Sequence, residues 1–249
     1  MTDQEHPRGA NRLLCLHGLG GGPYELGPLV EALRGAGRRV DAPVLPGHEA
    51  TGPVMPPSSW PEWVEAAEGW FDTLNSGDRP PAVVGFSTGA LIALRLATRR
   101  EVDRLVLLAP FFAIRYTGRL PFRPSPLIRA AARFTPNIPR RGPAVRDPIM
   151  KAEAARLDRF RTFNLRAAAS ALDLIDAIKP LVGSIRVPAL IIQGRLDTVV
   201  EPSGAAWLHR HLGSTEKHLI ELPGTDHLIA LDRERTRVIE AVDAFLAGR

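Results

Sequence analysis

A serine lies between two glycines in the segment Gly85-Phe86-Ser87-Thr88-Gly89. It directly follows the apolar run PAVVGF and precedes the run GALIALRLATRR, whose apolar residues have helical spacing. A tight turn from strand to helix needs small flanking residues, because the backbone doubles back while the serine sits at its tip. The pattern therefore predicts that Ser87 is a nucleophile for acyl transfer and that the Thr88 N–H donates to the oxyanion. The alternative is a strand-to-helix turn without chemistry.

A serine hydroxyl is a weak nucleophile at neutral pH, so it requires a base, and histidine titrates in the right range. We predict that His227 is this base, because it lies in PGTDHL between the last expected strand and the terminal helix. The other six histidines have structural interpretations: His6 lies in a polar tail, His209 and His211 in a helix, His218 in a strand, and His17 and His48 in loops where they form structural hydrogen bonds.

The base in turn needs an acid that fixes its tautomer and stabilises the imidazolium. We predict Asp197, which lies in IIQGRLDTVV just after the strand before the last one. Glu201 is the alternative. Asp226 precedes His227 directly, and adjacent residues rarely direct their side chains at each other's ring nitrogens, so a structural role is expected for it.

A second oxyanion donor should come from the loop after the first strand, His17-Gly18-Leu19-Gly20-Gly21-Gly22. Its glycines let the backbone approach a substrate closely, and we predict that the Leu19 N–H is the donor. A phosphate-binding loop is disfavoured, because the lysine of a P-loop is missing and Pro23 stands where the third glycine of G-x-G-x-x-G belongs.

These residues need a sheet to bring them together. Short apolar runs alternate with segments of helical period, which predicts an α/β fold with a mostly parallel twisted sheet of six to seven strands and helices on both faces. The expected strands are 12–17, 38–44, 81–86, 104–109, 187–193 and 217–222, and the expected helices are 24–34, 59–75, 88–99, 203–212 and 229–247. Ser59 and Glu62 have the spacing of a capping box at a helix start.

About 70 residues separate two of these strands, too many for a simple crossover. We interpret residues 111–182 as an inserted cap within a single domain of residues 1–249. Its first half is rich in proline and expected to be irregular, and Lys151 to Ile178 has helical spacing. The predicted pocket wall consists of Leu19, Phe86, Phe111, Phe112 and apolar residues of the cap.

Composition sets wider limits. The chain has 249 residues, 45% hydrophobic and 24% charged, as in an ordinary globular protein. No apolar run is long enough to span a membrane, and the start has no signal-peptide core. A single cysteine, Cys15, excludes an internal disulfide and is expected to be a buried strand residue. A cytoplasmic monomer or homodimer is expected.

The net charge of +5 is unevenly distributed. The stretch from Phe111 to Arg166 has twelve Arg and one Lys against Asp147, Glu153 and Asp158, a net +10. Such a surface could attract anionic lipid, nucleic acid or acidic substrates. We favour a merely solvated face, expect no nucleic-acid partner, and keep weak contact with anionic membranes as a hypothesis.

Together, LLCLHGLGG, LPGHE, GFSTG, QGRLD and the final DH resemble the α/β-hydrolase superfamily, and more narrowly small bacterial carboxylesterases and monoacylglycerol lipases. The resemblance implies the triad Ser87, Asp197 and His227, donors at Leu19 and Thr88, and no metal or cofactor. It also implies a sheet of mixed direction and a cap above the strand ends. About eleven residues precede the first strand, so the leading antiparallel hairpin of longer members should be mostly absent.

The expected reaction is hydrolysis of small carboxylic esters with short to medium acyl chains, with monoacylglycerols as candidates, through an acyl-enzyme. Fold does not fix the bond that is cleaved, so lactones, thioesters, C–C bonds and peroxide-forming chemistry stay open. Epoxide hydrolysis and dehalogenation are disfavoured, since those members carry an aspartate where Ser87 stands. A non-catalytic ligand-binding protein is the alternative of another class.

Overall fold

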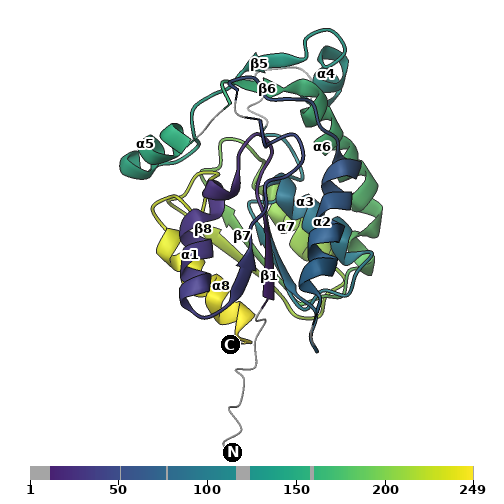
Figure 1. Ribbon diagram of the computed structural model, residues 1–249, viewed down its shortest axis with the longest axis vertical. Helices are drawn as coiled ribbons and strands as arrows, with labels where there is room; N and C mark the ends of the chain where they lie inside the picture. Colours follow the sequence, from purple (N-terminus) through teal and green to yellow (C-terminus); the bar gives the residue numbers. More distant parts are fainter. Residues whose placement is uncertain (1–11, 51, 77, 116–123, 158–159, 249) are drawn as a thin grey trace, which may run out of the picture.

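The computed structural model describes residues 12–50, 52–76, 78–115, 124–157 and 160–248. Its centre is a six-stranded sheet in the order β2-β1-β3-β4-β7-β8 (Figure 1). These strands are β1 (Arg12–Leu16), β2 (Arg39–Asp41), β3 (Ala82–Phe86), β4 (Leu105–Leu108), β7 (Ala189–Gly194) and β8 (Lys217–Leu222). The four central strands are buried almost throughout, as expected for strands that are covered on both faces.

The described strands of this sheet all run in the same direction. The parallel α/β sheet predicted from the alternating pattern is therefore confirmed. The mixed direction implied by the resemblance is wrong for the described residues. Each connection crosses a face of the sheet before the chain enters the next strand, as parallel strands require, whereas antiparallel strands can be joined by a short hairpin.

Helices cover both faces of the sheet (Figure 1). One face carries α1 (Gly27–Gly35), which follows the short 3₁₀ helix η1 (Pro23–Leu26), together with α8 (Arg235–Leu246). The other carries α2 (Trp60–Leu74), α3 (Thr88–Ala97), α6 (Leu165–Ile178) and α7 (Ser203–His211), with η2 (Lys179–Ser184) after α6. Each face has its own hydrophobic core. Cys15 lies in the core beneath α1 and α8, where burial raises the pKa of its thiol to about 12.

The helix starts differ in how well local sequence defines them. At α2 the predicted capping box forms, with Ser59 and Glu62 bonded to each other's backbone. The helix expected from Ile229 begins only at Arg235. Residues 228–232 are instead a buried turn, in which Ile229 is fully buried and Asp232 accepts backbone N–H groups. This tertiary packing prevails over the helical spacing.

Where an irregular proline-rich half followed by one helix was predicted, the segment between β4 and β7 forms helices and short strands in both halves. It contains α4 (Pro124–Ala131), β5 (Asn137–Pro139), α5 (Pro148–Leu157) and β6 (Thr162–Asn164) before α6. The helix expected over 151–178 is interrupted, because β6 pairs antiparallel with β5 and the Asn164 side chain then caps α6. Of the described elements, α4, β5 and β6 lie above the carboxyl ends of the strands, α5 lies to one side, and α6 packs against α2 and α3 (Figure 1).

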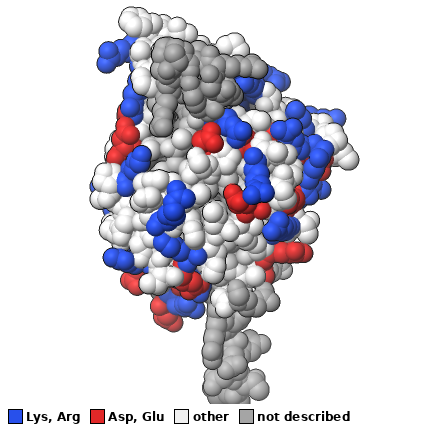
Figure 2. Space-filling model, turned by 180° about the vertical axis from the view of Figure 1, so that it is seen from behind, with Lys and Arg blue, Asp and Glu red and all other residues white. Residues whose placement is uncertain are grey.

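Charges on the surface are mixed. On the face seen in Figure 2, basic side chains are spread widely, with acidic side chains between them. Arg119, Arg123, Asp158 and Arg159, which belong to the basic stretch of the sequence, lie outside the described residues. Among the described residues, no helix has both the length and the apolar character that a bilayer crossing requires.

Candidate active site

Ser87 occupies a strained turn between β3 and α3. Its φ of 54° and ψ of −114° are unusual for a residue with a side chain. A Cβ on Gly85 would lie 2.6 Å from the Cα of Ala90, and a Cβ on Gly89 would lie 2.7 Å from the carbonyl oxygen of His17. Both glycines are thus required by close backbone approaches, as the sequence pattern predicts.

Three side chains from the ends of three strands form one hydrogen-bonded chain. The Ser87 hydroxyl donates to Nε2 of His227 at 3.1 Å. Nδ1 of His227 donates to Oδ2 of Asp197 at 2.8 Å. All three residues are buried, with exposures of 7%, 7% and 1% respectively. The arrangement can move a proton from the serine hydroxyl to the imidazole while the carboxylate holds the tautomer.

Asp197 is held by several donors. Its Oδ2 also accepts from Nε2 of Gln193 at 3.0 Å. Its Oδ1 accepts the N–H groups of Val199 and Val200, each at 2.8 Å. Asp197, and not the alternative Glu201, therefore receives the bond from His227.

The two members of the proton-transfer pair shift each other's pKa. Burial alone would raise the pKa of Asp197, but the charge of His227 and the hydrogen bonds outweigh it and hold this pKa below its usual value. Burial acts to lower the pKa of His227, yet the charge of Asp197 and the hydrogen bond to it raise it above the usual value. Glu25 and Asp226 act in the same direction as Asp197. The site therefore stabilises the imidazolium.

Two further histidines shape the loop that carries Leu19. Nε2 of His48 accepts the Gly20 N–H at 2.9 Å, and Nε2 of His17 accepts the Leu45 N–H at 2.9 Å. An imidazole that accepts at Nε2 carries its proton on Nδ1, which here lies near the carbonyl oxygens of Pro46 and Gly18. Burial and the neighbouring His48 lower the pKa of His17 to about 3, and burial also lowers the pKa of His48. Both histidines have the structural hydrogen-bonding role that was predicted.

A cavity of about 430 Å³ opens above Ser87 and His227. The predicted Leu19, Phe86, Thr88 and Phe111 line it, together with apolar side chains of the segment between β4 and β7 such as Ile114, Ile128, Ile138 and Phe163. The predicted Phe112 is not among the lining residues. Its ring instead packs 5.6 Å from that of Trp207, because neighbouring side chains in this turn face different ways.

Sequence reasoning missed several residues of the site. Glu25 is buried in the cavity wall, and its Oε2 accepts the Gly18 N–H at 2.9 Å. Arg140 reaches the carbonyl oxygen of Gly20 from the segment above the sheet. Gln193 belongs to the segment QGRLD, and its place four residues before Asp197 could have indicated a contact with that carboxylate. No local pattern marked Glu25 or Arg140.

The chain is similar to known lipolytic proteins over nearly its whole length. The chain is 27% identical over 239 residues to a thermostable monoacylglycerol lipase of Bacillus sp. (strain H-257), covering 94% of this chain and 90% of that one. It is 24% identical over 246 residues to a carboxylesterase of Bacillus subtilis (strain 168), covering 96% and 93%.

The crystal structure of a monoacylglycerol lipase from Paleococcus ferrophilus has a TM-score of 0.80 with this chain at 23% identity, covering 95% of this chain and 94% of that one. At that identity the likeness supports the fold alone, which is the α/β-hydrolase fold. The family model described as serine aminopeptidase, S33, matches residues 7–234. With the match extending over most of its length, the chain belongs to this serine aminopeptidase S33 family of α/β hydrolases.

Proposed function

We propose that this chain is a serine-dependent carboxylic ester hydrolase that works through an acyl-enzyme. The observation that carries the proposal is the hydrogen-bonded chain from Ser87 through His227 to Asp197 beneath a largely apolar cavity. Relatives over nearly the full length are a monoacylglycerol lipase and a carboxylesterase, which favours esters as the class of substrate.

In the first step, Oγ of Ser87 attacks the ester carbonyl carbon while Nε2 of His227 takes the hydroxyl proton. The negative charge that develops on the carbonyl oxygen is met by the backbone N–H groups of Leu19 and Thr88. When the tetrahedral intermediate collapses, the ester C–O bond breaks and His227 gives its proton to the departing alcohol. Ser87 is left acylated.

In the second step, water takes the place of the alcohol. His227 accepts a proton from this water as its oxygen attacks the acyl carbon, and then returns a proton to Oγ of Ser87 as the carboxylic acid leaves. Asp197 stays ionised in both steps, because its low pKa keeps the charge that stabilises the imidazolium. These roles need no metal or cofactor.

For the acyl group we propose short to medium chains. The cavity of about 430 Å³ lies in the lower part of the range of about 300–1,000 Å³ that is usual for sites of drug-sized ligands. Monoacylglycerols are candidates because a relative is named for them. Activity on p-nitrophenyl esters of increasing chain length should peak at short to medium acyl groups, and a maximum on insoluble long-chain triglycerides would contradict this.

The proposal is tested with Ser87→Ala and a chromogenic ester. Loss of such a nucleophile lowers kcat by about 10⁶-fold, so the variant should be inactive within the limits of the assay. The circular dichroism spectrum and melting temperature serve as controls for folding. Activity that survives in a folded variant would refute the proposal.

A panel of substrates separates the remaining reactions. It should include a lactone, a thioester, a C–C bond substrate and, because of the family's description, an aminoacyl anilide. We expect the highest kcat/KM on simple esters. A non-catalytic ligand-binding protein would turn over none of these compounds, and a fluorophosphonate probe would leave Ser87 unlabelled.

We further propose that residues 111–182, predicted as the cap of the single domain, form this cap only with the part before α6, because α6 packs against α2 and α3 in the helical layer. Residues 111–182 together supply most of the cavity wall. Several described arginines of this segment have partners within the chain: Arg115, Arg129, Arg140 and Arg146. This argues for weak contact with anionic membranes at most. Vesicle binding at low and high salt tests the membrane contact. Cell fractionation tests the cytoplasmic location that we propose, and size-exclusion chromatography tests whether the protein is a monomer or a homodimer.

A further inference from the structure

Asp226 joins the loop that carries the acid to the loop that carries the base. Its Oδ1 accepts both the backbone N–H and the hydroxyl of Thr198, each at 2.9 Å. The same oxygen accepts the backbone N–H of His227 at 2.9 Å. Because Thr198 directly follows Asp197, one carboxylate oxygen fixes the backbone next to both members of the proton-transfer pair.

The other oxygen of Asp226 faces the cap. Oδ2 lies 3.3 Å from Nε of Arg146, in the stretch between β5 and α5. The Arg146 side chain is 43% exposed, whereas that of Asp226 is 7% exposed. The ion pair therefore connects an exposed side chain of the cap to a buried carboxylate beside Asp197 and His227.

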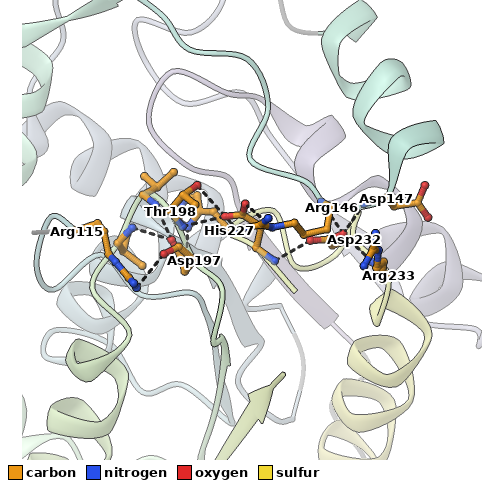
Figure 3. A network of polar contacts seen from close by, with 11 residues as sticks. Arg115, Arg146, Asp147, Asp197, Thr198, His227, Asp232 and Arg233 are labelled. Carbon is orange, nitrogen blue, oxygen red and sulfur yellow. Dashed lines mark hydrogen bonds and ion pairs between the residues drawn. The ribbon is translucent and has the colours of Figure 1, made fainter. Parts of the chain in front are cut away.

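Asp232 holds the same stretch of the cap from below. It is fully buried, and its Oδ1 accepts the N–H groups of Arg146 and Asp147, each at 2.9 Å (Figure 3). Its Oδ2 accepts the N–H of Asp226 at 2.7 Å. A buried carboxylate is stable only when donors satisfy it, and here these donors come from two separate segments. The His227 loop and the cap are thus joined through both side chains and backbone.

The arrangement restricts how the base can move. Pro143 and Ala144, which line the cavity, lie only a few residues before Arg146, and the N–H of Leu228 donates to the Ala144 carbonyl at 3.1 Å. A movement of this wall would therefore pull on the backbone on both sides of His227. General-base catalysis is sensitive to such shifts, because a displacement of about 1 Å can lower the rate about 100-fold.

We infer that Asp226 is a positioning residue for the pair Asp197 and His227, and that through Arg146 it couples the geometry of this pair to the cap. The inference rests on the proposed function, because it concerns the same base. It goes beyond that function by assigning a role in turnover to a carboxylate that touches no substrate and to an arginine of the cap.

Several charged groups surround the His227 ring and must be considered in any pH experiment. Asp197 lies on one side after β7, Glu25 approaches from η1, and Asp226 lies on the loop of His227 itself. Arg146 faces Asp226, and Arg115 donates to the backbone oxygen of Asp197 at 3.1 Å. Of these, only Asp226 and Arg146 are changed in the experiment.

The experiment compares Asp226→Ala, Asp226→Asn and Arg146→Met by steady-state kinetics on p-nitrophenyl butyrate. Asp226→Ala should lower kcat about 10- to 100-fold with KM within about threefold, because the base is misplaced while the cavity stays. Asp226→Asn should recover much of the kcat, since its amide oxygen can accept from Thr198 and His227. Asp226→Asn also removes one negative charge near His227, which should lower the pKa of the imidazole. The fall of kcat/KM in acid should therefore occur at a lower pH in this variant.

Coupling to the cap is tested by combination. Arg146→Met should lower kcat several-fold in the natural sequence and have no further effect in Asp226→Ala, because both changes break the same connection. Asp243→Asn is the matched control, since Asp243 also pairs with an arginine but lies in α8 at the end of the molecule near the C-terminus (Figure 1). It should leave kcat and the pH profile unchanged.

The inference is overturned if folded Asp226→Ala retains kcat within about twofold of the natural protein, or if the two substitutions are additive in kcat. If Asp226→Ala does not fold, Arg146→Met decides alone, and an unchanged kcat there refutes the coupling. Fluorophosphonate labelling of the natural protein separates the two proposals. Without labelling of Ser87 the proposed function fails, whereas labelling with an unaffected Asp226→Ala removes only this inference.

Discussion

At the scale of single residues, the protonation of His227 results from opposing influences. Burial disfavours the imidazolium, and the carboxylate of Asp197 with its hydrogen bond favours it more strongly. The site is therefore prepared for the positive charge that the proposed mechanism places on His227 during acyl transfer. The same preparation makes the free enzyme sensitive to acid.

This sensitivity can be measured in the pH profile. His227 must be neutral to accept a proton from Ser87, and its pKa lies above the ordinary value of 6.5. As pH falls through this raised pKa, the neutral fraction decreases, so kcat/KM should fall with a midpoint above 6.5. A profile on a soluble ester from pH 5 to 9 measures the midpoint, and a value below 6.5 would show that burial prevails over Asp197.

The acid can be distinguished from its alternative by two matched amides. Asp197→Asn should lower kcat by about 10⁴-fold, because the neutral side chain neither fixes the tautomer nor stabilises the imidazolium. Glu201→Gln removes a carboxylate four residues away that does not receive the His227 bond, and should leave kcat nearly unchanged. Equal losses in both variants would contradict the assigned roles.

The positions of Ser87, Asp197 and His227 were predictable because each follows a strand, and the carboxyl ends of parallel strands meet at one edge. Glu25 and Asp226 were not, since their partners are backbone N–H groups whose direction depends on the folded loops. For Asp226 the expectation of a structural role was compatible with the sequence, which contains no sign of the contact with Arg146.

At the scale of elements, the turn at Ser87 depends on backbones that nearly touch. Gly89 lies where a methyl group would overlap the carbonyl oxygens of Leu16 and His17, and neither oxygen belongs to a side chain that could move aside. The turn at Ser87 therefore depends on close packing between α3 and β1 as much as on its local conformation.

Two glycine-to-alanine substitutions test this requirement with opposite expected signs. Gly89→Ala should lower the free energy of unfolding by about 1–3 kcal/mol or more, because the added methyl overpacks the turn. Gly69→Ala, in α2 with open space around the new methyl, should raise it by up to about 1 kcal/mol through helix propensity. Urea unfolding of both variants provides the comparison. An unchanged free energy of unfolding in Gly89→Ala would contradict this explanation of the turn at Ser87.

Regular elements with continuous patterns were predicted well, and short paired elements were not. The buried strands β1, β3, β4 and β7 appear in the sequence as apolar runs. The three-residue strands β5 and β6 have no such run, because each is defined only by its partner. The apolar spacing over 151–178 therefore predicted one helix, although β6 divides this segment.

At the scale of the whole molecule, burial of neutral imidazoles ties the fold to pH. His17 and His48 accept N–H groups that connect the glycine-rich loop with the segment after β2. Protonation of either ring would remove its acceptor and place a charge in a buried site. The folded protein therefore resists protonation that the unfolded chain accepts.

The stability of the protein should accordingly fall in acid. The folded pKa of His17 is lowered from 6.5 to about 3, so its contribution is complete above about pH 6.5 and is lost progressively as pH falls from there toward 3. The slope contributed by this one group is at most about 1.4 kcal/mol per pH unit.

Urea unfolding between pH 7 and 4 measures that slope. His17→Gln should make it shallower, and His211→Gln, at an exposed position on α7, is the matched control. An equal slope in the natural protein and His17→Gln would show that the imidazole of His17 does not carry this dependence.

The architecture as a whole was within reach of the sequence because alternating strands and helices leave few solutions, and the sheet and its two helical layers follow. The mixed strand direction that the resemblance implied was not reliable, since it came from longer proteins. How the cap joins the His227 loop depends on Asp232 and Arg146. Their contacts bridge 80 residues of chain or more, and no local pattern contains them.

The central claim is that Ser87 becomes acylated during turnover. Rapid acid quenching of the protein with p-nitrophenyl butyrate, followed by peptide mass spectrometry, should find one butyryl group on the peptide that contains Ser87 and none in Ser87→Ala. Turnover of the ester with no adduct on Ser87, or with the acyl group on another residue, would contradict the account.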